Sequence, residues 1–549
     1  MSDQMATKPR PDGLVDPTRQ GESKGEDGKQ SNEPTVNLGN QRVAGVMFVP
    51  SSSRQPLPHR VQDTRRTDIL HVSTDDLTRT SHIRNALIKQ ISEAKHKVLF
   101  CSFLFADDEV VRALCDAAER LRGGVYVLTA LGKHLRAEVL ELDADVDANT
   151  AKLQDRAKRH EDHLQRLAHA GVWLRSAEDC HAKFCVVDDE IAVVTSANAT
   201  QEAYESNPED GLVLGEPRAA REYGRLFAHV WQYLSTLEST PGARLDVHSL
   251  GAPRVPSWRA LEGVGHVRPV TTLRRHETSL LGAAIEVIDR ANDHLSIATY
   301  SFMGMEGHPI GAALGRAIAR NVRVDLLVQP RNHVEAQRVS LAWLVGLAPD
   351  RVHLHGHRRT HTKSIVADGE VVLLWTGNLE SKHGWDNGIE VGVIVEDAGV
   401  ASAVAAWTGD VMRRATHAAL LAPSARELVE AGQPSALAGA WTLRLSPGVS
   451  LAHTVNALSR NAVELLEVPG GLVLRCADEL LLDVRIHEPS RTLEMLRARS
   501  VQGLMGSRSK GWLAASVLRI VSPPTPPRDQ DRGPRQQQHQ GRGKRGRRR

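Results

Sequence analysis

The residues best suited to chemistry lie in two stretches of this 549-residue chain that repeat one pattern. The first stretch, from His181 to Asn198, reads HAKFCVVDDEIAVVTSAN, and the second, from His361 to Asn378, reads HTKSIVADGEVVLLWTGN. Each contains a histidine, a lysine, an aspartate and an asparagine at identical spacing, and every landmark lies 180 positions after its counterpart. Such a match indicates an internal duplication.

This combination of side chains suits a phosphodiester. Lysine and asparagine donate hydrogen bonds to non-bridging oxygens, while an imidazole can act as a nucleophile or carry a proton near neutral pH. Each copy supplies only half of such a centre. If the copies pack about a pseudo-twofold axis, one histidine attacks phosphorus, the other protonates the departing oxygen, and the remaining donors hold the developing charge. The predicted catalytic set is His181, Lys183, Asn198, His361, Lys363 and Asn378.

Each stretch predicts a β-hairpin that would position these side chains. The runs on either side of each turn are rich in β-branched residues, and the second copy turns at Asp368 and Gly369, a dipeptide that favours hairpins. Counting along the ladder from the turn places Asn198 within about one position of His181. The histidine and the lysine, two positions apart, share one sheet face. Asp188 and its counterpart lie at the turns, so we predict that they anchor the hairpins.

The two stretches resemble the signature of the phospholipase D superfamily, H-x-K-x4-D-x6-G-[ST]-x-N. The resemblance extends over a frame of helices and strands from about Leu70 to about Leu421. It implies a two-lobed fold, a covalent phosphohistidine and chemistry without metals or other cofactors. The superfamily's glycine before the hydroxyl is Thr195 in the first copy and Trp375 in the second, and a tryptophan facing Lys363 would narrow the site.

The resemblance also assigns roles to residues outside the central six. The downstream acids that buttress the histidines match Glu209 in NPEDGLVL and Glu390 in NGIEVGVIV, and they would fix the histidine tautomers. The resemblance makes His181 the nucleophile and leaves His361 as the general acid. The remaining supporting residues are the motif hydroxyls Ser196 and Thr376 and the strand-end serines Ser102 and Ser301.

The segments before the two motifs repeat one order of predicted elements. SHIRNALIKQISEAK, KVLFCSFLF, VVRALCDAAERL and GVYVLTAL alternate as helix, strand, helix and strand, and SLLGAAIEVIDRA, LSIATYSF, IGAALGRAIAR and VRVDLLV repeat that order. This alternation predicts crossover units, parallel pairing and an α/β sandwich in each lobe. Taking Ser102 and Ser301 as equivalent gives an offset of 199, which leaves 19 additional residues (199 − 180) in the first lobe. We assign them to a helical insert at about 133–170, either a solvated helical hairpin or a lid beside the site.

The sequence therefore predicts an α/β protein of two similar lobes related by pseudo-twofold symmetry, with further segments at both ends. Alternating apolar residues after Trp441 indicate a small β-rich domain in which TLEMLRARSV is expected to be helical, and a short apolar run from Val43 to Val49 would add an edge strand. The predicted divisions are a disordered region at 1–65, lobe 1 at 66–250, lobe 2 at 251–422, the β-rich accessory domain at 436–522 and a basic disordered tail at 523–549.

Composition limits the classes of protein that the chain can belong to. Charged residues make up 25% and hydrophobic residues 41%, as in ordinary globular proteins. Five cysteines without a secretory segment predict reduced thiols in a cytoplasmic protein, and no apolar run is long enough to cross a bilayer. From Pro523 onward, nine Lys and Arg against two Asp give +7, which leaves −4 for the rest because the whole chain carries +3. The tail is the basic part of the protein.

The spacing of cysteines and histidines leaves a zinc site as an alternative use of the motif region. Cys180, His181 and Cys185 are close in sequence, but neighbouring strand positions point to opposite faces, whereas zinc needs about four converging ligands. The later histidines, His353, His355, His357 and His361, do share one face. The superfamily resemblance implies no metal, and we predict none.

These observations favour a phosphodiesterase that cleaves nucleic acid. A polybasic Gly/Arg tail binds phosphate polymers, and it would equally bind an anionic membrane surface. The first alternative is therefore a phospholipase D or phosphatidyltransferase that acts on phospholipid headgroups. The second is a nucleic-acid-binding scaffold with a silent site. Both half-sites lie in one chain, so a monomer would be sufficient for activity.

Overall fold

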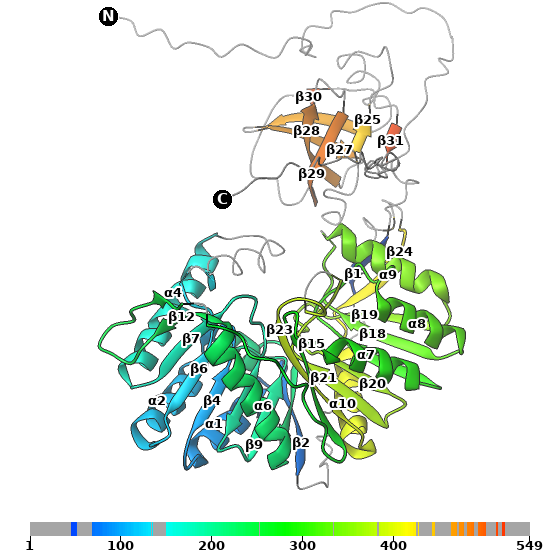
Figure 1. Cartoon of the computed structure of the whole chain (residues 1–549). Helices are drawn as coiled ribbons and strands as arrows, with labels where there is room; N and C mark the ends of the chain where they lie inside the picture. The colour runs from blue at the N-terminus through cyan, green and yellow to red at the C-terminus, as the bar shows by residue number, and fades with distance from the viewer. Residues whose placement is uncertain are drawn as a thin grey trace, which may run out of the picture. The chain divides into compact units, whose positions relative to one another are not determined.

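The computed structural model describes residues 45–51, 68–132, 134–135, 150–251, 253–332, 334–381, 384–423 and 427, together with the strands of a further sheet between 442 and 521. One compact unit, Ala44–Ala436, contains both repeats, and a second unit combines Met1–Val43 with Leu437–Arg549. The predicted α/β fold of two similar lobes is confirmed in the first unit (Figure 1). The predicted disordered tail at 523–549 lies outside the described residues.

The first lobe is built on a ten-stranded sheet. Its strands are β2 (Ile69–Asp75), β3 (Thr80–Ser81), β4 (Val98–Cys101), β6 (Val125–Leu128), β7 (Trp173–Ala177), β8 (Phe184–Val187), β9 (Ile191–Thr195), β11 (Glu209–Leu214), β12 (Ser235–Ser239) and β13 (His248–Ser249). They follow the order β13-β12-β7-β6-β4-β8-β9-β11-β2-β3. A separate parallel pair joins β5 (Phe105–Ala106) to β10 (Ala199–Thr200).

The second lobe repeats this arrangement in another ten-stranded sheet. Its strands are β1 (Val46–Pro50), β14 (Val267–Leu273), β15 (Glu277–Thr278), β16 (His294–Ala298), β18 (Arg323–Val328), β19 (Val352–Gly356), β20 (Ser364–Ala367), β21 (Val371–Trp375), β23 (Ile389–Val395) and β24 (His417–Leu421). They follow the order β1-β24-β19-β18-β16-β20-β21-β23-β14-β15. The separate pair here joins β17 (Phe302–Met303) to β22 (Leu379–Glu380).

Helices occupy the four amphipathic segments predicted before the two motifs, and further helices lie elsewhere in the described residues. The Asp107 side chain caps one of them by accepting a hydrogen bond from the Val110 amide, and this helix buries Val110, Leu114 and Ala117 at helical spacing. The helices are α1 (His82–Glu93), α2 (Asp108–Arg120), α4 (Thr150–His169), α5 (Gln201–Glu205), α6 (Pro217–His229), α7 (Ser279–Arg290), α8 (Pro309–Ala319), α9 (Glu335–Leu347) and α10 (Ala398–Arg413), with a π-helical turn η3 (Val230–Leu234) after α6. Within the part of the chain described, none has the length and apolarity needed to span a bilayer.

Strand pairing is mixed, because the motif hairpins differ from the crossover strands. β4, β6 and β7 pair in parallel, as do β16, β18 and β19, since a helix returns the chain between successive strands. Next to them the hairpins β8–β9 and β20–β21 add antiparallel strands. Parallel pairing was therefore a correct prediction only for the crossover strands.

The three largest hydrophobic clusters among the described residues hold the compact unit together. One lies under α1, α2 and α4 of the first lobe, and another lies under α7, α8 and α9 of the second. The third draws buried side chains from both sheets and from α6 and α10, so the two lobes share one core. The Tyr223 hydroxyl, 2.7 Å from the Gly392 carbonyl oxygen to which it donates, adds a direct link across this core.

Within the predicted N-terminal region at 1–65, the structure describes residues 45–51, and these include a strand. Strand β1 pairs antiparallel with β24 at the edge of the second sheet, and Val46, Met47 and Phe48 have almost no exposed surface. The side chain of Asn332 holds this strand through both the amide and the carbonyl group of Phe48, each at 2.8 Å. The apolar run had favoured an edge strand, and the assignment of the whole region to disorder was wrong for these residues.

The predicted insert at about 133–170 does contain a helix, but this helix is not an addition to the first lobe. Helix α4 lies between β6 and β7 just as α9 lies between β18 and β19, so it is a regular crossover helix with a counterpart in the other lobe. It has 20 residues against 13 in α9. The remaining surplus, including 136–149, lies outside the described residues.

The C-terminal unit contains a seven-stranded sheet. Its strands are β25 (Thr442–Arg444), β26 (Val463–Val468), β27 (Gly471–Cys476), β28 (Leu480–His487), β29 (Thr492–Ser500), β30 (Trp512–Leu513) and β31 (Arg519–Val521). The predicted β-rich character is correct, but the segment expected to be helical is strand β29, paired antiparallel with β28. Its sequence is rich in good helix formers, so tertiary pairing overrides local propensity there.

Candidate active site

The two motif hairpins have the register that their turns predict. Val187 pairs with Ile191 in the first lobe, and Ala367 pairs with Val371 in the second. At the other end of each ladder, the amide of the residue at the superfamily's glycine position donates to the carbonyl of the motif lysine at 3.2 Å in both lobes. Each hairpin therefore brings its histidine, lysine and asparagine to one end of a strand pair.

The motif aspartates lie at the opposite end of the hairpins, in the turns. Asp188 has a φ of 55° and accepts hydrogen bonds from three successive amides, those of residues 95–97, at 2.7–2.9 Å. Asp368 has a φ of 53° and accepts from the amides of residues 292–294 at 2.8–3.0 Å. Both carboxylates thus anchor the hairpin turn to the loop that precedes the central strand.

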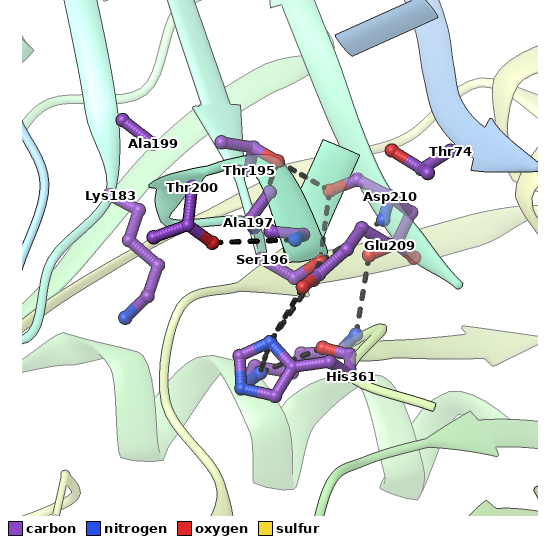
Figure 2. A network of polar contacts seen from close by, with 12 residues as sticks. Thr74, Lys183, Thr195, Ser196, Ala197, Ala199, Thr200, Glu209, Asp210 and His361 are labelled. Carbon is purple, nitrogen blue, oxygen red and sulfur yellow. Dashed lines mark hydrogen bonds and ion pairs between the residues drawn. The ribbon is translucent and has the colours of Figure 1, made fainter. Parts of the chain in front are cut away.

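Each histidine is held by the glutamate of the opposite lobe. His181 Nδ1 lies 2.8 Å from Glu390 Oε1, and His361 Nδ1 lies 2.9 Å from Glu209 Oε1. Figure 2 shows the second of these pairs, with the Glu209 carboxylate directed at the His361 ring. The sequence had named both acids but gave no sign that they exchange partners between lobes.

Backbone contacts beside these pairs cross between the lobes in the same way. The His181 amide donates to the carbonyl oxygen of Ile389, and the His361 amide donates to that of Pro208, both at 3.0 Å. Each acceptor immediately precedes the glutamate that holds the same histidine. The paired contacts fix the main chain and the ring of each histidine to one segment of the other lobe.

The motif hydroxyls position the two acids. Ser196 Oγ donates to Glu209 Oε2 at 2.5 Å, and Thr376 Oγ1 donates to Glu390 Oε2. Burial alone would raise the pKa of each glutamate, but the facing histidine and nearby lysines lower the pKa of both below its ordinary value. Two carboxylates that stay ionised would keep the Nδ1 atoms protonated and direct each Nε2 atom away from its acid.

Both motif lysines are buried beside their histidines. Lys183 Nζ donates to the His181 carbonyl oxygen at 2.5 Å, and Lys363 Nζ donates to the His361 carbonyl oxygen at 2.7 Å. Their exposed fractions are 1% and 0%. Burial lowers the pKa of Lys183 and brings the pKa of Lys363 to about 7, although nearby carboxylates oppose this shift.

The histidine rings keep 19% and 21% of their side-chain surface exposed, for His181 and His361 respectively. Burial and the adjacent lysines lower the pKa of His181, while Glu390 raises it. Burial lowers the pKa of His361 to about 4 against the opposing effect of Glu209, and Lys363 Nζ lies 3.1 Å from its Nδ1 atom. Both shifts favour the neutral form of the ring at pH 7 in the isolated protein.

The motif asparagines keep hydrogen-bonding capacity for a further group. In the described part of the chain, the Oδ1 atoms of Asn198 and Asn378 are buried without a hydrogen-bond partner. Asn378 Nδ2 donates to Glu380 Oε1 at 3.3 Å. A substrate or water that donates to these oxygens would remove the cost of leaving them unsatisfied.

An aromatic ring lies beside each histidine, and the sequence analysis missed both rings. Phe103 lies 6.1 Å from His181 between ring centroids, and Tyr300 lies 5.4 Å from His361 in an edge-to-face arrangement. The Arg331 guanidinium in turn lies 5.0 Å from the centroid of the Tyr300 ring. The signal was available, because both aromatic residues follow the central strand of their lobe.

The structure changes the pairing of the strand-end serines. Ser102 Oγ donates to the Leu104 carbonyl oxygen and accepts from the Ala199 amide. Thr299 Oγ1 makes the equivalent contacts, since it donates to the Ser301 carbonyl oxygen and accepts from the Leu379 amide. The true counterpart of Ser102 is therefore Thr299, and equating it with Ser301 was wrong by two positions. The offset is 197, so the first lobe holds 17 additional residues (197 − 180) rather than 19. Ser301 is fully buried and donates to Glu380.

Trp375 is a core residue of the second lobe. It has no exposed surface, and its ring centroid lies 6.0 Å from that of Trp385 within the hydrophobic cluster of that lobe. Its counterpart Thr195 donates through its hydroxyl to the Asp210 carbonyl oxygen at 2.8 Å. The two residues that replace the expected glycine therefore serve different packing roles.

The alternative of a zinc site has no ligand set in the part of the chain that the structure describes, where no group of three His, Cys, Asp or Glu side chains could hold a metal ion. Cys185 is fully buried, and burial raises its pKa far above the ordinary value. The Cys180 Sγ atom lies 3.7 Å from the Sγ atom of Cys101.

Two segments of the chain, residues 87–231 and 284–411, match the family model described as cardiolipin synthase, PLD-like domain. The two segments contain the two motifs and the elements that carry them. The chain belongs to the phospholipase D superfamily. As a member of this superfamily, the protein is an enzyme that acts on phosphodiesters. It contains two copies of the phospholipase D-like domain.

Three of the solved structures that are similar to this chain are the following. Phosphatidylserine synthase of Haemophilus influenzae is 12% identical, with a TM-score of 0.44, over 72% of this chain and 95% of that one. The phospholipase D family member Nuc of Salmonella typhimurium is 19% identical, with a TM-score of 0.23, over 30% and 95%. Polyphosphate kinase of Porphyromonas gingivalis is 14% identical, with a TM-score of 0.38, over 63% and 48%. No curated protein matches in sequence.

Proposed function

We propose that this protein is a phosphodiesterase that cleaves nucleic acid through a phosphohistidine intermediate. The observation that carries the chemistry is the crossed arrangement of His181 with Glu390 and His361 with Glu209. It ties both rings to the same seam between the lobes and leaves each Nε2 atom for a reacting group. Neither lobe alone supplies a complete histidine–acid pair.

In the first step, neutral His181 attacks phosphorus, and the bond from phosphorus to the leaving oxygen breaks as His361 gives that oxygen a proton. The two lysines and the two asparagines contact the non-bridging oxygens as negative charge develops on them. In the second step, His361 takes a proton from water while that water attacks phosphorus. The P–N bond to His181 then breaks, which returns both rings to their starting states.

The general acid needs a higher pKa in the complex than in the isolated protein. Burial brings the pKa of His361 to about 4, and the Lys363 ammonium close to its Nδ1 atom further opposes protonation. A phosphodiester carries a negative charge, which favours the imidazolium form of a histidine within about 4–6 Å. Binding of the substrate would therefore charge the acid where it is needed.

The choice of nucleic acid as substrate is supported by the basic tail. Residues 523–549 carry a net charge of +7, from nine Lys and Arg against two Asp, and such a segment binds phosphate polymers with a strong dependence on salt. Five cysteines fit a reducing cytoplasmic location, which we include in the proposal. Both motifs lie in one compact unit, which supports activity as a monomer.

The second candidate is a phospholipase D or phosphatidyltransferase that acts on phospholipid headgroups. It is favoured by the description of the matching family model as a cardiolipin synthase domain. The same tail would hold such an enzyme at an anionic membrane surface. The chemistry at His181 and His361 is common to both candidates, so only the substrate distinguishes them.

The test uses the full-length protein in a chelator, with three substrates in parallel: a chromogenic phosphodiester, labelled single- and double-stranded DNA and RNA, and phospholipid vesicles. We expect cleavage of nucleic acid, and a phosphate label on His181 after acid-free quenching and peptide mapping. The matched control is His181→Ala. Turnover of lipid without turnover of polynucleotide would select the second candidate, and the absence of any turnover would favour a binding scaffold.

Deletion of residues 523–549 tests the tail. We expect weaker binding of DNA or RNA and a shallower dependence of the affinity on salt, with unchanged turnover of the chromogenic diester. Unchanged affinity and salt dependence would contradict a role for the tail in binding the substrate.

A further inference from the structure

Two cysteines outside the catalytic set lie against each other beside the first histidine. The Sγ atoms of Cys101 and Cys180 are 3.7 Å apart. Cys101 is the last residue of β4, and Cys180 immediately precedes His181. The Cys101 thiol also lies 3.2 Å from the carbonyl oxygen of Ala182, to which it donates. The pair therefore contacts the chain on both sides of the catalytic histidine, at Cys180 before it and at Ala182 after it.

Three structural features hold these thiols together. In the sheet, Cys101 pairs with Phe184 of β8, so its side chain reaches back along the segment that carries the motif. Cys180 forms a bridge to Ile389 of the other lobe, which fixes it at the seam. The ammonium group of Lys183 also lies near both thiols. The pair is a consequence of the fold rather than a contact between free loops.

The two thiols differ in access. Cys180 is partly exposed, whereas Cys101 has an exposed fraction of 2%. Burial and the neighbouring Cys180 raise the pKa of Cys101 well above its ordinary value. A small oxidant in solution would therefore meet Cys180 first, and Cys101 would act as the resolving thiol.

We propose that Cys101 and Cys180 form a disulfide in response to hydrogen peroxide, and that this bond reversibly switches off the half-site built on His181. In the first step, the Cys180 sulfur attacks peroxide and the O–O bond breaks, which gives Cys180 sulfenic acid and water. In the second step, the Cys101 sulfur attacks that sulfenic sulfur, the S–O bond breaks, and the thiol proton leaves with the hydroxyl group as water. A dithiol reductant returns both thiols.

The bond would displace the catalytic segment. A disulfide has an S–S distance of about 2.0 Å, so the two sulfur atoms, now 3.7 Å apart, must approach by about 1.7 Å. The adjacent His181 amide donates to Ile389, and its carbonyl oxygen accepts from Lys183. A displacement of about 1 Å in such a site costs about 10²-fold in rate. This effect on turnover rests on the proposed function, whereas formation of the disulfide does not.

The second lobe provides matched control residues. Ala298 pairs with Ser364 as Cys101 pairs with Phe184, and Thr360 precedes His361 as Cys180 precedes its histidine. Both Ala298 and Thr360 are fully buried. Cys101→Ala and Cys180→Thr therefore install side chains that the same fold already accommodates at equivalent positions.

The experiment treats full-length wild-type protein, Cys101→Ala and Cys180→Thr with hydrogen peroxide, quenches with an alkylating reagent and maps disulfides by mass spectrometry. A parallel sample is assayed on the chromogenic phosphodiester before peroxide, after it and after a dithiol reductant. We expect a Cys101–Cys180 cross-link in the wild type only. We also expect loss of at least tenfold in turnover with the cross-link, recovery after reduction, and full activity in both variants throughout.

The two readouts separate the possible failures. Absence of the cross-link at peroxide concentrations that convert Cys180 to sulfinic acid would overturn the proposal, and so would a cross-link that leaves turnover unchanged. Equal loss of activity in wild type and both variants would place the damage elsewhere and would also overturn it. If no sample turns over any diester, the proposed function fails, while the cross-link still reports on the thiol pair. Inactivity of one variant alone is resolved by the other, because each removes the disulfide independently.

Discussion

The two lobes carry the same histidine, lysine, asparagine, hydroxyl, glutamate and aspartate, yet the residues around these sets differ. Phe103 lies beside the first histidine and Tyr300 beside the second. A thiol ends the central strand in the first lobe, and Ala298 ends it in the second. The shared residues are those that the proposed reaction uses in each half-site. We infer that the differing surroundings assign the two rings to different roles.

The lysine environments illustrate this division. The Lys363 amide lies 3.2 Å from Asp210 Oδ1, a buried carboxylate of the opposite lobe. The counterpart of Asp210 in the second lobe is Val391, which offers no such acceptor to Lys183. Burial raises the pKa of Asp210. The half-site that holds the proposed general acid thus contains an additional titratable group that sequence reasoning did not single out.

The largest expected effect comes from exchanging the two histidines for alanine one at a time. His181→Ala should lower turnover by roughly 10⁴-fold or more and abolish the phosphoenzyme, because the nucleophile is lost. His361→Ala should cost about 10²- to 10⁴-fold with a poor leaving group and much less with p-nitrophenolate, which needs no proton. Steady-state rates on both kinds of diester measure the difference. Equal sensitivity to the leaving group in both variants would contradict the assignment of His181 as nucleophile and His361 as general acid.

The crossed glutamates should give the second largest effect, and each should act on the opposite lobe. Glu209→Gln should reproduce the leaving-group dependence of His361→Ala, and Glu390→Gln should slow phosphorylation of His181, each by about 10²-fold, because the paired histidine loses its carboxylate partner. Burst kinetics and peptide mapping distinguish these outcomes. A Glu209→Gln enzyme that was impaired only in formation of the phosphoenzyme would contradict the crossed pairing.

The pH dependence should reveal the different surroundings of the two lobes. Because the pKa of His361 lies at about 4, its protonated fraction falls as pH rises above that value, so kcat/KM should decline toward neutral pH. The profile of kcat should lie at higher pH, because bound phosphate raises the pKa. A pKa of about 7 for Lys363 adds an increase in KM above neutral pH, when this lysine loses its charge. Lys363→Arg should remove that increase, since an arginine stays protonated.

The smallest effect on turnover is expected at the turns. Asp188→Asn and Asp368→Asn should each cost about 1–3 kcal/mol of stability, because three amides lose a charged acceptor, and should change kcat less than about threefold. Backbone amides lower the pKa of both carboxyls against the effect of burial, so their contribution is present above the unfolded pKa and is lost as pH falls through the folded pKa. Thermal unfolding between pH 3 and 7 measures this. A large loss of kcat in a stably folded variant would show that the turns act on the chemistry.

Much of the site was predictable because it depends on local rules. Turn residues fixed the hairpin register, and alternation along a strand placed His181 and Lys183 together. Contacts between lobes were not predictable, because spacing within one repeat contains no information on which histidine a glutamate meets. The predicted equivalence of Ser102 with Ser301 failed for a similar reason. It was based on the Ser-Phe dipeptide that both segments contain, whereas the hydrogen bonds that identify Thr299 can be seen only in the structure. The segment of strand β29 was predicted to be helical from its local propensity, but antiparallel pairing with strand β28 determines its conformation.

Strand β1 has a practical consequence for anyone who trims this protein. A fragment that began at residue 66, where the first lobe was expected to start, would lack Val46–Pro50 and leave the outer edge of β24 uncovered. Asn332 would lose both backbone partners, and a row of unpaired amides and carbonyls would invite association between molecules. The truncation would therefore cause aggregation through the second lobe, although most of that lobe lies more than 200 residues after the cut in the sequence.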